Sequence, residues 1–251
     1  MTVVEPTPLW PARLWLVRHA ESAGNVARET AEAARHDRIA LDTRDVDVPL
    51  SDLGKRQAAA YGAWLAARPA EEQPTAVRVS PYLRAVQTVE TALAAAGLDL
   101  PVTVDERLRE REFGVLDGLT KQGILAQWPE EAARRSEVGK FYHRPPGGES
   151  WTDALLRVRS AVADLRHDCA GERVLVVAHQ VVVLLLRYVV EGMTEAEVLA
   201  VDRAGEVANC SVTSYVLDGG GLRLERYNDV THLAAEDEAV TVEPEGPHGR
   251  A

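Results

Sequence analysis

Two short apolar runs, each followed at once by a histidine, constrain the fold of this chain more than any other feature. Residues 14–17 (LWLV) lead into Arg18 and His19, and residues 173–178 (RVLVVA) lead into His179. Continuous apolar runs of this length are typical of strands that are buried on both faces of a parallel sheet. The carboxyl ends of such strands border the crevice where open α/β sheets bind ligands. The pattern therefore predicts that both imidazoles share one site.

The length and composition favour one large α/β domain. The chain has 251 residues, of which 46% are hydrophobic, and this is enough for an ordinary buried core. No linker rich in Pro, Gly or Ser interrupts its middle. We expect a loose lead-in over residues 1–11, a single domain over residues 12–233 and an acidic, disordered tail over residues 234–251.

Charge and cysteine content exclude several classes of protein. The formal net charge is −11, whereas a protein that binds nucleic acid shows a basic face or stripe. The cysteines, Cys169 and Cys210, form neither a CxxC pair nor a zinc spacing, and we interpret them as buried apolar residues. No stretch approaches the roughly 20 apolar residues of a membrane span, and the first residues do not resemble a secretion signal. We therefore expect a soluble, cytoplasmic protein with no nucleic-acid or membrane partner.

Capping and turn residues place the other elements. Ser51 and Ser150 are each expected to cap a helix, and Ser80 and Pro81 are expected to begin another that stops at Gly97. Further helices are expected over residues 26–34, 120–139 (broken at Pro129) and 181–190, and further strands over residues 75–79, 102–104, 209–217 and 222–227.

Arginine accompanies the histidines. Arg18 precedes His19, and Arg84 is expected in the first turn of the helix that follows residues 75–79, pointing back toward the strand end. A guanidinium is a planar fork of donors that binds phosphate or carboxylate through two hydrogen bonds. Two such groups beside two imidazoles describe a site for a compact dianion. A metal site is disfavoured, because the sequence has no HxH or HExxH spacing and arginine would oppose a bound cation.

Six segments, in order, resemble signatures of the histidine phosphatase superfamily, which includes the cofactor-dependent phosphoglycerate mutases and fructose-2,6-bisphosphatase. They are RHAESxxN (residues 18–25, with Ala20 where the family has glycine), PLSxxGxxQA (49–58), SPxxRAxQT (80–88), a segment similar to LxExxFG (108–114), PGGES (146–150) and the second histidine at 179. The resemblance covers residues 13–180. It implies an α/β fold of the phosphoglycerate mutase type: a three-layer α/β/α sandwich with a mainly parallel central sheet.

The resemblance also implies a role for the matched polar residues. His19 would be the nucleophile that forms a phosphohistidine, while Arg18, Asn25, Arg84 and His179 would bind the phosphoryl group. Attack requires a neutral imidazole, so we expect a backbone carbonyl or a similar acceptor to hold the ring nitrogen opposite the attacking one.

A carboxylate completes the implied site. Glu110 would protonate the leaving oxygen and then activate water, although Glu106 and Glu112 lie close by in the sequence and are alternatives. The resemblance implies neither a metal nor an organic cofactor.

Seven further residues are candidates for contacts with the substrate. They are Glu21, Ser22, Arg111, Lys121, Tyr142, Arg144 and Gln180. Gln180 follows the second histidine, where mutases carry Gly-Asn-Ser, and with residues 141–144 it resembles the fructose-2,6-bisphosphatase branch. Lys121 resembles a substrate-contacting lysine of the mutases. The connection over residues 26–48 is long, and we expect it to reshape the mouth of the pocket.

We expect, on this resemblance, a metal-independent phosphomonoester hydrolase that acts on a small phosphorylated metabolite. A phosphoglycerate mutase is the alternative, and a catalytically silent module that binds phosphorylated ligands is a remote third. The expected partner is a small-molecule phosphate ester. The sequence identifies neither that substrate nor the oligomeric state, for which a homodimer is one option.

Overall fold

A six-stranded mixed sheet forms the centre of the molecule. The computed structural model describes residues 10–242. The strands are β1 (Arg13–Arg18), β2 (Ala76–Val79), β3 (Val102–Val104), β4 (Arg173–Ala178), β5 (Val212–Asp218) and β6 (Gly221–Asp229). They lie in the order β3-β2-β4-β1-β5-β6; the first four are parallel, β5 is antiparallel to β1, and β6 is antiparallel to β5. The predicted mainly parallel sheet is confirmed.

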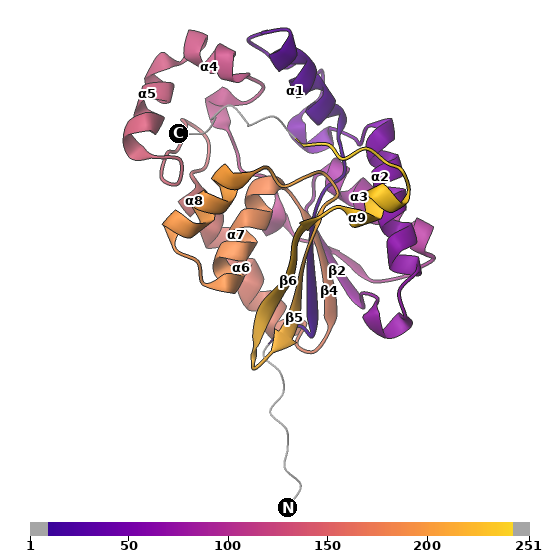
Figure 1. The fold of residues 1–251 in the computed structure, drawn as a ribbon. Helices are drawn as coiled ribbons and strands as arrows, with labels where there is room; N and C mark the ends of the chain where they lie inside the picture. The colour runs from indigo at the N-terminus through magenta and orange to yellow at the C-terminus, as the bar shows by residue number, and fades with distance from the viewer. Residues whose placement is uncertain (1–9, 243–251) are drawn as a thin grey trace, which may run out of the picture.

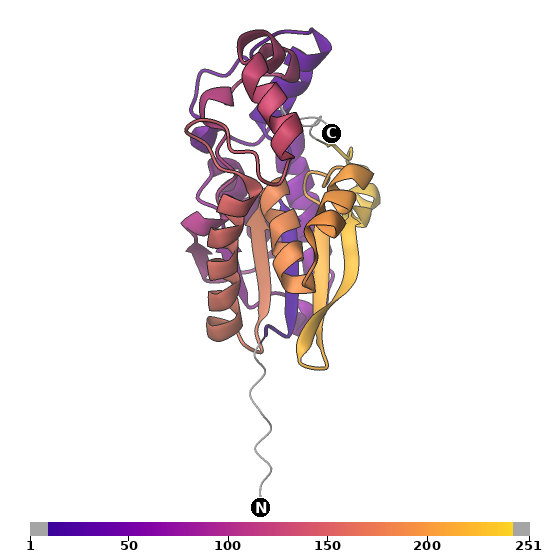
Figure 2. The same cartoon turned by 90° about the vertical axis from the view of Figure 1, so that its left-hand side faces the viewer.

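Helices cover both faces of the sheet (Figures 1 and 2). On one face lie α2 (Asp52–Ala66) and α3 (Leu83–Ala96), and on the other α6 (Trp151–Asp168) and α7 (Gln180–Glu191). Side chains alternate across a strand, so Leu14 and Leu16 of β1 pack in the core with α6 and α7, whereas Trp15 and Val17 pack with α2 and α3. Because both faces of the sheet are buried at β1, the sequence of this strand is a continuous apolar run. The predicted three-layer α/β/α architecture is confirmed.

A second group of helices lies beyond the carboxyl ends of the parallel strands (Figure 1). It consists of α1 (Ala23–Ala33), α4 (Lys121–Gln127) and α5 (Pro129–Val138), with the short 3-10 helices η1 (Asp45–Asp47), η3 (Glu106–Leu108) and η4 (Gly114–Leu116) in the connections. Pro129 begins α5, as its position predicted. Two hydrogen bonds join the connection after α1 to the segment before α4. The Ile39 amide donates to the Gly118 carbonyl, and the Thr120 amide donates to the Asp37 carbonyl.

Two helices were not predicted. Thr194 caps α8 (Glu195–Ala204) and forms a capping box with Glu197, so the T-x-x-E pattern was the available signal. The five-residue α9 (Thr231–Ala235) is too short for a periodic pattern. Within residues 10–242, no helix is long and apolar enough to cross a membrane.

The prediction that Ser80 caps a helix is wrong. The helix α3 begins at Leu83, and its N-cap residue is Tyr82. The Ser80 hydroxyl is instead buried against the ring of His179, with 2.7 Å between Oγ and Nε2. A contact across 99 residues thus takes the place of a local cap.

The described part of the acidic C-terminal segment packs on the domain. Glu238 forms an ion pair with Arg56 of α2, the Gln57 amide donates to the Ala239 carbonyl, and residue 241 accepts a hydrogen bond from the Asn209 amide. The expected disorder is therefore not found in residues 234–242. Residues 1–9 of the expected lead-in and residues 243–251 of the expected tail lie outside the described residues.

Candidate active site

Two neighbouring strands carry the two histidines. β1 and β4 pair in parallel with Arg18 opposite Ala178, and the His19 amide donates to the Ala178 carbonyl at 2.9 Å. The rings of His19 and His179 lie 5.1 Å apart between centroids in an edge-to-face arrangement. The predicted shared site at the carboxyl ends of the strands is present.

His19 is held in one tautomer. Its Nδ1 lies 2.8 Å from the carbonyl oxygen of Ala20, and because a carbonyl only accepts, Nδ1 carries the proton and donates it. Nε2 is then the unprotonated nitrogen of the ring. Burial, followed by the positive charges of Arg84 and Arg18, lowers the pKa of His19 well below its usual value. The ring is therefore neutral at pH 7, with its nitrogens arranged as the resemblance implied.

His179 lies beside His19 and is fully buried. Burial and the charge of Arg84 lower its pKa well below the usual value, so this imidazole is also neutral. Its Nε2 is engaged by Ser80, while its Nδ1 is buried and has no hydrogen-bond partner within the described residues. The residues that line the pocket containing His19 include neither His179 nor Arg18, which are both fully buried.

A short polar chain orients Arg18, which is completely buried. Its Nη1 donates to the Val207 carbonyl at 2.5 Å and to the side-chain carbonyl of Gln180 at 2.9 Å. The amide nitrogen of Gln180 donates in turn to the carboxylate of Glu206. Gln180 therefore holds the guanidinium of Arg18, a contact that its position after the second histidine did not reveal.

The guanidinium of Arg84 is bound by an aspartate that sequence reasoning missed. Arg84 lies in the first turn of α3, as expected. Its Nη1 donates to Oδ1 of Asp45 at 2.9 Å and to the Asp45 main-chain carbonyl at 2.7 Å, and its Nη2 donates to Oδ2 at 3.1 Å. Asp45 lies in η1, within the long connection that was expected to reshape the pocket mouth.

Among the three candidate carboxylates, only Glu110 lines the pocket that contains His19. It accepts a hydrogen bond from the backbone amide of Arg111 at 2.7 Å. Glu106 and Glu112 are exposed, and Glu112 accepts a hydrogen bond from the hydroxyl of Tyr82. Of the three carboxylates, Glu110 is therefore the one that shares a pocket with His19.

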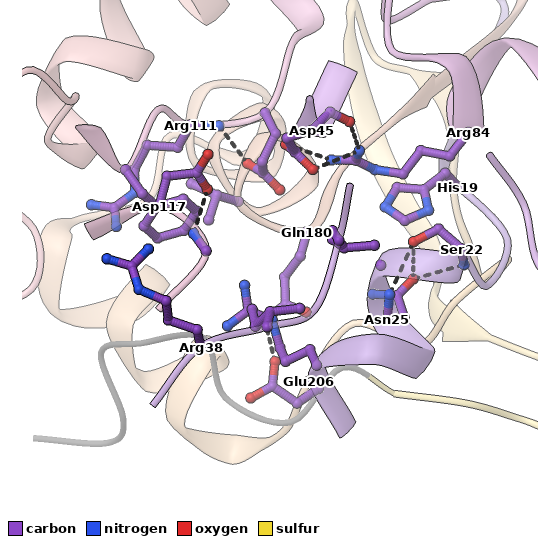
Figure 3. A pocket seen from close by; sticks show the side chains of 18 of the residues that line it. His19, Ser22, Asn25, Arg38, Asp45, Arg84, Arg111, Asp117, Gln180 and Glu206 are labelled. Carbon is purple, nitrogen blue, oxygen red and sulfur yellow. Dashed lines mark hydrogen bonds and ion pairs between the residues drawn. The ribbon is translucent and has the colours of Figure 1, made fainter. Parts of the chain in front are cut away.

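The pocket has a volume of about 320 Å³ and is strongly charged. Figure 3 shows His19, Arg84 and Asn25 at one end, and Arg38 and Arg111 at the other. The charged side chains that line it are Arg28, Arg38, Asp45, Arg84, Glu110, Arg111, Asp117, Arg135, Lys140, Asp202 and Glu206. Burial lowers the pKa of Arg111 to about 10, because its guanidinium is far from water.

Four of the other predicted residues also line the pocket: Ser22, Asn25, Arg111 and Gln180. Ser22 and Asn25 form the capping box that begins α1. Burial and this reciprocal hydrogen bonding fix both side chains at the pocket wall.

The remaining predicted substrate contacts lie outside the pocket lining. Glu21 accepts a hydrogen bond from Ser51 at 2.6 Å and supports the start of α2. Tyr142 is exposed and donates to Glu195 at 2.7 Å. Arg144 forms an ion pair with Asp153, and Lys121 is exposed on α4; neither of these cations lines the pocket.

Residues 10–242 contain no cluster of three His, Cys, Asp or Glu side chains that would hold a metal ion. His19 and His179 are instead accompanied by Arg18 and Arg84, whose charges favour an anion.

Comparison with known proteins identifies the family. Residues 14–230 match the model of the histidine phosphatase superfamily, branch 1, and the chain belongs to this superfamily. A 2,3-bisphosphoglycerate-dependent phosphoglycerate mutase of Gloeobacter violaceus is 36% identical over 177 residues, which are 67% of this chain and 70% of that enzyme. A mutase of Methylobacterium radiotolerans is 37% identical over 122 residues, 47% of this chain and 57% of that enzyme.

Phosphatases are also among the similar proteins. The 6-phosphofructo-2-kinase/fructose-2,6-bisphosphatase of Caenorhabditis elegans is 30% identical over 176 residues, which are 69% of this chain and 33% of that protein. The solved structure of a mycobacterial glucosyl-3-phosphoglycerate phosphatase with inorganic phosphate has a TM-score of 0.67 and 27% identity, and the match covers 88% of this chain and 99% of that one. The relatives thus include both mutases and phosphatases.

Proposed function

We propose that this protein is a metal-independent phosphomonoester hydrolase that acts on a small phosphorylated metabolite through a phosphohistidine at His19. The observation that carries the proposal is the state of His19: the Ala20 carbonyl holds Nδ1, and burial lowers the pKa of the ring. Nε2 is therefore an unprotonated nucleophile at pH 7.

The reaction has two steps. Nε2 of His19 bonds to phosphorus as the bond from phosphorus to the ester oxygen breaks, and protonated Glu110 gives its proton to the departing oxygen. Ionised Glu110 then takes a proton from water as the water oxygen attacks phosphorus. The phosphorus–nitrogen bond breaks, inorganic phosphate leaves, and His19 and protonated Glu110 are restored.

Arg18, Arg84 and His179 stabilise the transferring phosphoryl group. Its three equatorial oxygens carry the negative charge of the transition state, and the two guanidinium groups and Nδ1 of His179 are the donors that surround His19. These donors are buried, so their hydrogen bonds are stronger than the same bonds in water.

Water is the acceptor that we favour over a second sugar acid. Gln180 follows the second histidine, where mutases carry Gly-Asn-Ser, and its side-chain amide joins Arg18 to Glu206 through hydrogen bonds. The similarity to a solved phosphatase supports this choice. The mutases of Gloeobacter violaceus and Methylobacterium radiotolerans support the alternative, a phosphoglycerate mutase. A silent binding module is disfavoured, because His19, Arg84 and Glu110 line one pocket and the charge of Arg18 acts on His19.

The first test is phosphate release from a panel of phosphomonoesters in the presence of EDTA. His19→Ala should abolish release, by at least about a thousandfold, because the nucleophile is lost. His167→Ala is the matched control, since His167 is 91% exposed on α6. Acid-quenched wild-type enzyme should carry phosphate on His19. Release that needs a divalent metal, or that persists in His19→Ala, contradicts the proposal.

A second arm separates hydrolase from mutase. The enzyme is mixed with 3-phosphoglycerate and 2,3-bisphosphoglycerate, and both the 2-phospho isomer and free phosphate are measured. We expect phosphate release to exceed isomerisation. Isomerisation that is faster and depends on the bisphosphate would assign the mutase activity instead.

A further inference from the structure

The carboxylate of Asp45 occupies the donor fork of Arg84 (Figure 3). The two nitrogens of the guanidinium each donate to one carboxylate oxygen, at 2.9 and 3.1 Å. A pair of parallel N–H···O bonds is also how arginine binds phosphate. Asp45 and a phosphoryl group therefore compete for the same donors.

The segment that carries Asp45 is held at its two ends. Before it, the Ile39 amide donates to the Gly118 carbonyl at 2.9 Å, and after it, the Ala23 amide donates to the Pro49 carbonyl at 2.9 Å. Among residues 10–242, the Val48 amide donates to the Asp45 carbonyl at 3.3 Å, and the hydrogen bonds that join residues 40–47 to more distant parts of the protein are those between Asp45 and Arg84. Loss of this one contact would release the segment without disturbing its anchors.

Asp45 lies on the solvent side of the buried cations. Arg84 is 6% exposed and His19 is 3% exposed, whereas the side chain of Asp45 is 44% exposed. An incoming phosphate ester meets this carboxylate before it meets the guanidinium, and like charges repel.

We propose that Asp45 is a built-in competing anion that sets the affinity of the site for phosphate esters and for inorganic phosphate. The inference rests on the proposed function in that it takes the Arg84 site to be the phosphoryl site. Binding exchanges one anion for another at Arg84, and Asp45 moves away with residues 40–47. Inorganic phosphate makes the same contacts as the substrate phosphoryl group, so the returning Asp45 also promotes release of the product.

Competition of this kind multiplies the intrinsic dissociation constant by the reciprocal of the fraction of molecules in which Arg84 is open to the ligand. If Asp45 holds Arg84 in about nine molecules of ten, the apparent Kd for phosphate is about tenfold higher than the intrinsic value. Removal of the carboxylate should recover that factor.

The test measures inorganic phosphate binding to the full chain by titration calorimetry, with no turnover required. Asp45→Asn and Asp45→Ala should each lower the Kd for phosphate about tenfold relative to wild type. Asp47→Asn is the matched control, because Asp47 lies in the same 3-10 helix but pairs with Arg44 at 2.8 Å. Its Kd should equal that of wild type.

Amide hydrogen exchange gives a second readout of the same contact. Phosphate should increase exchange over residues 40–47 in wild type, because the ligand releases that segment, and should cause no increase in Asp45→Ala. An unchanged or higher Kd in the Asp45 variants overturns the inference, since Asp45 would then position Arg84 rather than compete for it. Phosphomonoester hydrolysis by wild type, measured separately, shows whether the proposed function fails or stands in that case.

Discussion

His19 combines two properties that solution imidazole does not have together: a fixed tautomer and a pKa that is well below its usual range. The Ala20 carbonyl provides the first, and burial beside Arg84 and Arg18 provides the second. Each cation that would bind the phosphoryl group thus also keeps the nucleophile unprotonated. In the proposed reaction the arginines would act twice, once before the substrate arrives and once in the transition state.

The lowered pKa of His19 predicts the acid side of the pH profile. His19 must be neutral to attack, and because its pKa lies well below 6.5, the ring remains neutral as the pH falls through 6.5. We expect kcat/KM for hydrolysis to persist below pH 6 and to fall only as the lowered pKa is reached. A profile of kcat/KM between pH 4 and 8 checks this, at constant ionic strength. An acid limb centred near pH 6.5 would contradict the assignment of His19.

Ser80 is expected to matter through His179. Ser80→Ala removes the hydroxyl that lies 2.7 Å from Nε2 and frees the ring to change its tautomer or rotate. We expect kcat to fall by about tenfold to a hundredfold with little change in KM, in line with the usual effect of an imidazole that is poorly oriented. Steady-state kinetics measure the split. Ser160→Ala, at an exposed serine of α6, is the control and should behave as wild type.

At the scale of elements, the pairing of α2 and α3 depends on a close approach of their backbones. A Cβ at Gly62 of α2 would lie 2.3 Å from the carbonyl oxygen of Ala92 in α3. Since Arg84 is carried by α3, this contact also determines where the guanidinium of Arg84 lies.

Gly62→Ala should therefore destabilise the protein. Alanine is intrinsically better than glycine within a helix by about 1 kcal/mol, so propensity alone predicts the opposite sign. The collision with Ala92 is expected to outweigh that gain and to lower the free energy of unfolding by about 1–3 kcal/mol, the usual range for overpacking. Urea unfolding measures the difference. Gly205→Ala is the control, because nothing lies near its Cβ position and its φ of 168° is extended.

For the whole molecule, the features that could be predicted are those with a local sequence signal. The apolar runs at residues 14–17 and 173–178 identified the central strands, because burial on both faces leaves no polar alternation. The capping box at Ser150 correctly identified the start of α6. The histidines followed from the strands, since each one comes immediately after a strand end.

The features that were missed depend on contacts between distant residues. Asp45 lies in a charged stretch with no periodicity, and its partner Arg84 is 39 residues away. Ser80 has the local pattern of a helix cap, yet a histidine 99 residues away takes its hydroxyl. Tyr142 and Arg144 follow the family pattern, but neighbouring carboxylates bind them outside the pocket. Local sequence does not reveal which of several partners a polar side chain will contact.

β1 is synthesised long before the two strands that pair with it in the sheet. β1 pairs only with β4 and β5, which are the strands at residues 173–178 and 212–218. A ribosome adds roughly 5–20 residues per second, so this apolar strand emerges about 8–30 s before either of its partners. Throughout that interval its backbone edges are open to other nascent chains. The yield of active enzyme in a cell is therefore expected to depend on how well chaperones shield the first strand until the last third of the chain appears.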